Sequence, residues 1–118
     1  MAFPEAEFTG MTQPCERADP VDRGHLDRQT MGDISLAAEV LQIFALQASA
    51  AHAVISESNA DERRRLAHRL KGAARGVGAF GVADSAGILE EYPLNEAAVA
   101  RLRADIDEAC AFIATGMA

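Results

Sequence analysis

Apolar residues recur every three or four positions along most of this chain, and this spacing limits the fold more than any other feature of the sequence. It is the spacing of one face of an α-helix, and it holds from Val21 onward. Two stripes stand out, formed by Ala37, Val40, Leu41, Phe44, Ala48, Ala51 and Ile55 and, further along, by Val99, Leu102, Ile106, Ala109, Cys110 and Ile113. Since no segment shows the clear alternation of a β-strand, the sequence predicts an all-α fold.

Capping residues and helix breakers divide the periodic region into helices. Asp33, Asn59 and Asn95 are of residue types that cap helix N-termini. Gly32 suits the left-handed conformation at a helix end, and Pro93 stops a helix. The expected helices span about residues 21–30, 33–58, 59–78 and 80–92, with a last one from residue 95 onward. Because short loops favour antiparallel neighbours, we expect an up-down-up-down four-helix bundle with an additional short N-terminal helix.

The length and composition fit one small domain. The chain has 118 residues, 49% of them hydrophobic, with five Phe, one Tyr and no Trp, so the core must be built mainly from Leu, Ile, Val and Ala. Residues 1–20 hold three of the four prolines and show no period. We therefore expect an irregular N-terminal arm over residues 1–20 and a helical domain over residues 21–118.

The same sequence disfavours several locations and partners. No stretch reaches the roughly 18 uninterrupted apolar residues of a membrane span, and the acidic start lacks the features of a signal peptide. We therefore expect a cytoplasmic protein without membrane contact. Cys15 and Cys110 share no metal-ligand or redox spacing, so no metal site is expected. The formal net charge of −7 argues against nucleic acid as a partner.

This acidic chain nevertheless gathers six of its eleven basic residues in one short segment, at Arg63, Arg64, Arg65, Arg69, Lys71 and Arg75. The inward stripe of the third helix is expected to be Leu66, Leu70, Ala73 and Val77. His68 then points roughly 180° away from the core. Helical spacing places the following residues on the same outward surface: Arg64, Lys71, Gly72 and Arg75.

An outward imidazole among cations permits two interpretations. The first is a solvated basic helix face with an incidental histidine. The second is a nucleophile, because imidazole is neutral and basic near physiological pH and its Nε2 can attack phosphorus. Lys71 would then stabilise the charge of a transferred phosphoryl group. Gly72 costs about 1 kcal/mol relative to Ala in mid-helix, and a glycine there makes sense if another molecule must come close.

The residues around His68 also carry a resemblance to a known family. The stretch AHRLKGAARGVGAFGVADSAGILEE resembles the histidine-containing phosphotransfer (HPt) domains of bacterial phosphorelays. In those domains a histidine is followed by Leu-Lys-Gly, then a Gly-Ala near the helix end, then an Ala- and Leu-rich helix closing in an acid. The upstream segment GDISLAAEVLQIFALQA resembles the family's preceding helix, and the resemblance covers about residues 21–114. It implies that residues 21–118 form an HPt four-helix-bundle domain.

The resemblance implies roles for four residues. His68 would be phosphorylated, Lys71 would contact the phosphoryl group, and Gly72 would leave room for the partner's aspartate. Family members often carry an acid or amide 22 positions after the histidine, and this count falls on Glu90. Helical spacing puts Glu90 about 80° from the inward stripe of its own helix, so it is expected to reach across and accept a hydrogen bond from His68 Nδ1.

The function so implied is that of a phosphorelay intermediate. His68 would accept a phosphoryl group from a receiver-domain aspartate of a hybrid histidine kinase and pass it to an aspartate of a response regulator. No Gly-rich phosphate loop precedes a helix, so no kinase domain is expected, and Mg²⁺ would belong to the receiver. The chain is expected to act as a monomer, with Arg64, Arg65 and Arg75 docking on the receiver's acidic pocket.

Two alternatives remain open at this point. The first is a helical adaptor or inhibitor that docks on a kinase or receiver domain without being phosphorylated, although such a binder would not need His68, Lys71 and Gly72 together. The second is a nucleic-acid-binding helix that uses the arginines of ERRRLAHRLKGAAR, which the acidic remainder and the shortage of aromatic residues disfavour. Phosphohistidine formation separates the adaptor from the phosphorelay intermediate.

Overall fold

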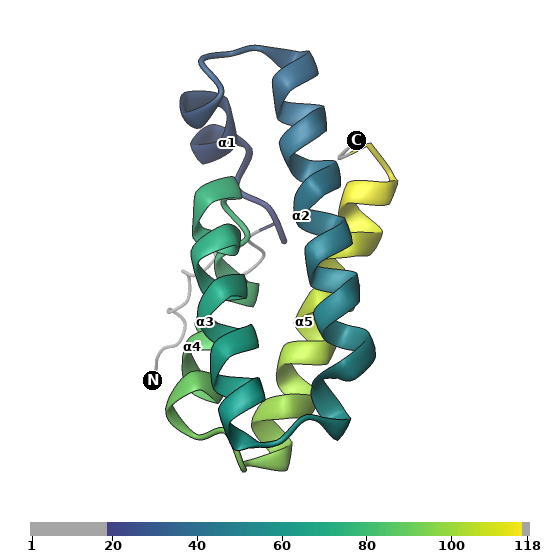
Figure 1. Cartoon of the computed structure of the whole chain (residues 1–118). Helices are drawn as coiled ribbons and strands as arrows, with labels where there is room; N and C mark the ends of the chain where they lie inside the picture. The colour runs from purple at the N-terminus through teal and green to yellow at the C-terminus, as the bar shows by residue number, and fades with distance from the viewer. Residues whose placement is uncertain (1–18, 117–118) are drawn as a thin grey trace, which may run out of the picture.

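The computed structural model describes residues 19–116, and these residues are almost entirely helical (Figure 1). In chain order the elements are α1 (Arg23–Gln29), α2 (Ile34–Val54), the 3-10 helix η2 (Ile55–Glu57), α3 (Ala60–Val77), α4 (Phe80–Glu91) and α5 (Glu96–Ala114). The predicted all-α bundle with a short N-terminal helix is confirmed. The predicted arm over residues 1–20 lies, except for its last two residues, outside the described residues.

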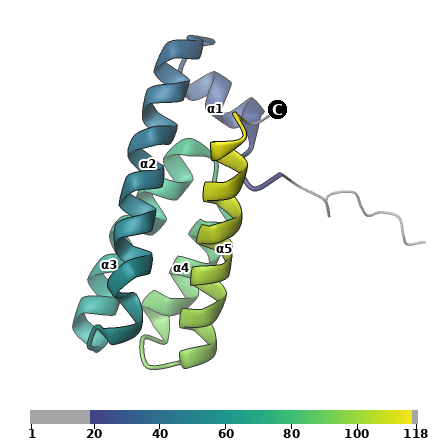
Figure 2. The ribbon, with the colours of Figure 1, turned by 90° about the vertical axis from the view of Figure 1, so that its right-hand side faces the viewer.

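The helices α2, α3, α4 and α5 form a ring: α2 packs against α3, α3 against α4 and α4 against α5, and α5 closes the ring against α2. Figures 1 and 2 show these four helices running alternately up and down, with α1 across one end of the bundle. A backbone hydrogen bond of 2.9 Å from Asp22 N to Gly78 O fastens the start of α1 to the end of α3. Val21 and Leu26 of this segment are buried, so α1 covers that end of the core.

The helix boundaries follow from local capping chemistry. Asp33 accepts a hydrogen bond from Leu36 N at 3.0 Å, and Asn95 accepts one from Ala98 N at 3.1 Å. At the start of α3, Asn59 and Glu62 each accept a 2.9 Å hydrogen bond from the other's backbone N–H, which is the reciprocal capping box. These three predicted caps are confirmed. The long helix ends earlier than expected, because residues 55–57 tighten into the 3-10 helix.

The core agrees with the predicted stripes on α2 and α5, but the stripe on α3 is shifted. Its buried residues are Arg63, Ala67, Leu70, Ala74 and Val77, whereas Leu66 and Ala73 are only partly buried. The shift arises because α3 makes its most extensive contact with α4, and the small side chains of Ala67 and Ala74 let the two helices approach closely. Of the predicted stripe, Leu70 and Val77 are buried, whereas Leu66 and Ala73 lie at the edge of the core rather than within it.

One helix among the described residues, α2 with its 3-10 extension (Ile34–Glu57), has the length and the apolar composition of a membrane-spanning segment. The segment is not an uninterrupted apolar run, because it contains Glu39 and His52. In the fold, this helix buries Leu41, Phe44 and Ala48 in the bundle. Only 22% of its apolar window is buried, so this helix contributes one face to the core.

Candidate functional site

His68 lies in the middle of α3, with 69% of its side chain exposed. It borders an open depression of about 400 Å³, whose lining is Asp61, Arg64, Arg65, His68, Arg69 and Glu90. The exposed position that the sequence predicts for this imidazole is therefore where the structure places it. A depression of this kind, with a nucleophilic side chain and several cations, is suited to an anionic group.

Glu90, near the end of α4, contacts two residues of α3 with its two carboxylate oxygens. Oε2 lies 2.8 Å from Nδ1 of His68, and Oε1 lies 2.7 Å from Nζ of Lys71. Three quarters of the Glu90 side chain is covered, which limits the competition from water. The structure thus brings together the side chains of His68, Lys71 and Glu90, three of the four residues to which the family resemblance gives roles.

The pKa of Glu90 is lowered from its ordinary value, mainly by the hydrogen bond from Lys71 and next by the one with His68. Partial burial opposes this shift but does not cancel it. Glu90 is therefore an ionised carboxylate at neutral pH, and such a group can only accept hydrogen bonds. His68 Nδ1 must then carry the proton, which leaves the lone pair of a neutral imidazole on Nε2.

Gly72 lies one turn after His68 and is exposed on α3. A Cβ atom added at this position would meet nothing within 4 Å, and the same holds for Gly76 one turn further. Internal packing therefore does not require glycine at either position. The backbone of α3 is bare next to the imidazole, so another molecule can approach it closely there.

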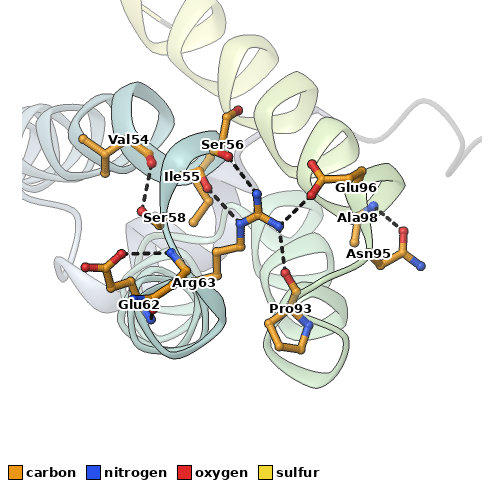
Figure 3. Close-up of polar contacts among 11 residues, drawn as sticks. Val54, Ile55, Ser56, Ser58, Glu62, Arg63, Pro93, Asn95, Glu96 and Ala98 are labelled. Carbon is orange, nitrogen blue, oxygen red and sulfur yellow. Dashed lines mark hydrogen bonds and ion pairs between the residues drawn. The ribbon is translucent and has the colours of Figure 1, made fainter.

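The six basic residues of α3 do not form one outward face. Arg63 is 4% exposed, and its guanidinium binds four acceptors on neighbouring segments (Figure 3). Nε donates to Ile55 O at 3.0 Å and Nη2 to Ser56 O at 2.8 Å. Nη1 donates to Pro93 O at 2.9 Å and to Glu96 Oε2 at 3.0 Å. Arg63 therefore does not belong to the basic surface around His68, because this side chain satisfies carbonyls where helices end.

The remaining cations differ in what they contact. Arg64 pairs with Asp61 at 3.1 Å, and Lys71 is turned toward Glu90 with 23% of its side chain exposed. Arg65 and Arg69 are exposed and line the depression, whereas Arg75 is exposed but does not border it. Sequence reasoning did not single out Arg69, although its position directly after His68 was a usable signal.

The described residues also show whether side chains are placed to bind a metal ion. Among residues 19–116, no group of three His, Cys, Asp or Glu side chains has the arrangement needed to hold a metal ion. The other two histidines lie away from His68: His52 pairs with Asp107 of α5 at 3.1 Å, and the His25 ring stacks edge-on against Phe80.

Comparison with known proteins gives one match. The model of the Hpt domain family matches residues 33–112, which is more than half of the chain and includes His68, Lys71, Gly72 and Glu90. Neither the curated proteins nor the solved structures compared with this chain gave a match.

Proposed function

We propose, from the premise that this chain belongs to the Hpt domain family, that it is a phosphorelay intermediate phosphorylated on His68. Hpt domains carry out phosphotransfer in two-component signalling, and they work with receiver domains. The finer proposal is that His68 takes a phosphoryl group from a receiver aspartate of a hybrid histidine kinase and gives it to an aspartate of a response regulator. The observation that carries it is the exposed imidazole whose Nδ1 is held by Glu90 at 2.8 Å.

The proposed step is an in-line displacement at phosphorus. The Nε2 lone pair of His68 forms the new N–P bond, while the P–O bond of the aspartyl phosphate breaks and the carboxylate leaves with its electron pair. Nε2 carries no proton in this tautomer, so none has to be removed before attack. The positive charge that develops on the ring is stabilised by Glu90 through the Nδ1–H hydrogen bond.

Lys71 and Gly72 have supporting roles in the proposal. Lys71 holds Glu90 in its ionised form through the 2.7 Å contact, and its ammonium adds positive charge near the phosphoryl group. Gly72 leaves the α3 backbone bare, so the aspartate of a receiver can approach Nε2. These roles are consistent with the open space above Gly72 and with the partly covered position of Lys71.

Docking would rest on charge as well as shape. The chain carries a net charge of −7, yet Arg64, Arg65 and Arg75 are exposed on the helix that bears His68. Receivers present an acidic pocket that holds Mg²⁺, so these arginines would steer the encounter and the metal would come with the partner. We propose that the chain acts in the cytoplasm as a monomer, which leaves this face free for a receiver.

The test is phosphoryl transfer from a panel of phosphorylated receivers to the full-length chain and to His68→Gln. We expect label on the wild type and none on the variant, with the free energy of unfolding changed by only about 0.5 kcal/mol because the side chain is exposed. His52→Gln is the matched control and should be labelled like the wild type. Label on His68→Gln, or receivers that bind the wild type without ever labelling it, would contradict the proposal, and the second outcome would support a pure adaptor.

A further inference from the structure

The cations around His68 can be separated by what they already bind. The guanidinium of Arg63 is buried and donates four hydrogen bonds, Lys71 contacts Glu90, and Arg64 contacts Asp61. Arg65 and Arg69 form no ion pair with any residue in the 19–116 range. Only these two cations of the depression therefore keep their full hydrogen-bonding capacity for an incoming anion.

Helix geometry favours Arg65 over Arg69. Arg65 precedes His68 by three residues, so it lies about 4.5 Å along the axis and about 60° around it. Residues three apart are neighbours on a helix surface, and Arg65 and His68 line the same depression. Arg69 is about 100° around the helix and also lines a second groove with Leu66 and Leu70, on the side of α2.

We propose that Arg65 binds the phosphoryl group on Nε2 of His68, so that it takes part in the transfer step itself. This inference rests on the proposed function of His68 and assigns Arg65 a role beyond docking. A planar guanidinium can offer two parallel N–H donors to two phosphoryl oxygens, which a lysine ammonium does not match. Lys71 keeps Glu90 ionised on one side of the imidazole, and Arg65 neutralises the phosphoryl oxygens on the other.

In the transfer step, no covalent bond of Arg65 forms or breaks. The N–P bond to Nε2 forms while the bond from phosphorus to the donor's leaving group breaks, and the leaving group departs with that electron pair. The three phosphoryl oxygens keep their negative charge throughout, and the fixed positive charge of Arg65 lowers the energy of the arrangement in which they lie next to Nε2. No proton is exchanged with the guanidinium, which stays charged.

Phosphoramidate is a suitable probe because it donates a phosphoryl group directly, with ammonia as the leaving group, and needs no receiver. The full-length wild type, Arg65→Gln, Arg65→Lys and Arg69→Gln would be incubated with it, and the initial rate of His68 phosphorylation would be measured by intact mass. We expect Arg65→Gln to lower the rate about tenfold, Arg65→Lys to restore part of it, and Arg69→Gln to lower it less. Arg28→Gln, an exposed arginine of α1, should match the wild type.

Melting temperatures of all variants show whether the fold is intact, because Arg65 is exposed and its loss should leave the fold unchanged. The inference is overturned if Arg65→Gln reacts like Arg28→Gln, or if Arg69→Gln has the larger effect. The two proposals fail separately. If phosphoramidate labels His68 of the wild type but no phosphorylated receiver does, the proposed relay function is contradicted. The rates with phosphoramidate would still decide whether Arg65 has the proposed role.

Discussion

Arg63 and His68 lie five residues apart on α3, and each is a polar side chain that hydrogen-bonds to another part of the bundle. Arg63 is buried, and all three of its guanidinium nitrogens have acceptors on the η2 segment, on Pro93 or on Glu96. His68 is exposed, and within residues 19–116 only its Nδ1 is held, by Glu90. The two side chains therefore differ in whether every nitrogen already has a partner within the protein.

This difference separates a polar group that stabilises the fold from one that is free to react. A buried guanidinium whose nitrogens are all hydrogen-bonded is not available to bind another molecule. Its removal leaves several buried acceptors without a hydrogen-bond donor. A half-held imidazole has a fixed orientation and one unused lone pair, which is what a nucleophile requires. The comparison predicts that stability and phosphoryl acceptance respond to different substitutions on the same helix.

The largest effect is expected for Arg63→Ala. It removes the donor for three backbone carbonyls and for Glu96, and we expect the free energy of unfolding to fall by about 3 kcal/mol. Arg64→Ala, whose parent side chain is exposed, should change it by about 0.5 kcal/mol or less. Urea unfolding measures both. Equal losses of unfolding free energy from the two substitutions would show that the buried hydrogen bonds of Arg63 contribute no more to stability than the exposed side chain of Arg64.

A smaller effect is expected for Glu90→Gln, and it should depend on pH. Because the pKa of Glu90 is lowered in the fold, its stabilising contribution is present above the pKa of the unfolded chain and is lost as pH falls through the lowered value. At pH 7 the variant should be less stable than the wild type by about 0.5 to 1 kcal/mol, the range of partly exposed ion pairs. The two proteins should converge in acid.

The control for this titration is Glu91→Gln, since Glu91 is exposed and forms no ion pair with the residues that the structure describes. Its stability relative to the wild type should not change with pH in the same way. If Glu90→Gln and Glu91→Gln give parallel curves of unfolding free energy against pH, the contacts of Glu90 with Lys71 and His68 contribute nothing measurable in solution.

The smallest effect on stability is expected for Gly72→Gln, and its sign is opposite. Glutamine has the higher helix propensity and meets no neighbour at this position, so the free energy of unfolding should rise by about 0.5 kcal/mol. Transfer from a phosphorylated receiver should nevertheless slow, because a long side chain would stand where the receiver approaches. An unchanged transfer rate would mean that the bare backbone beside His68 has no role in docking.

The helices and their caps were predictable because capping depends on residues within one turn, as Asp33, Asn59 and Asn95 illustrate. The register of α3 was not predictable in the same way. An apolar stripe leaves out charged residues, whereas Arg63 is buried because segments outside α3 supply hydrogen-bond acceptors for it. Arg63 falls four residues before Ala67 and seven before Leu70, so its place on the inward face was present in the spacing. Its acceptors near Ile55 and Pro93 could be known only from the fold.

At the candidate site, the family resemblance led to Glu90, and the structure adds the division of its carboxylate between His68 and Lys71. Spacing alone could not give that division, because it depends on how far α4 is rotated against α3. For the same reason, sequence spacing placed Lys71 on the outward face, whereas its ammonium is turned to the neighbouring helix. Helical periodicity fixes the direction in which a side chain leaves its own helix, but not the partner it meets.

The way α1 closes the bundle has a consequence for choosing the minimal fragment of this protein. The family match begins at residue 33, yet Val21 and Leu26 are already part of the core, and Asp22 is bonded to the end of α3. A fragment trimmed to the family boundaries would uncover the apolar end of the bundle and stop before α5 does. The unit to express for binding or transfer work therefore begins ahead of Val21 and extends beyond Ala114.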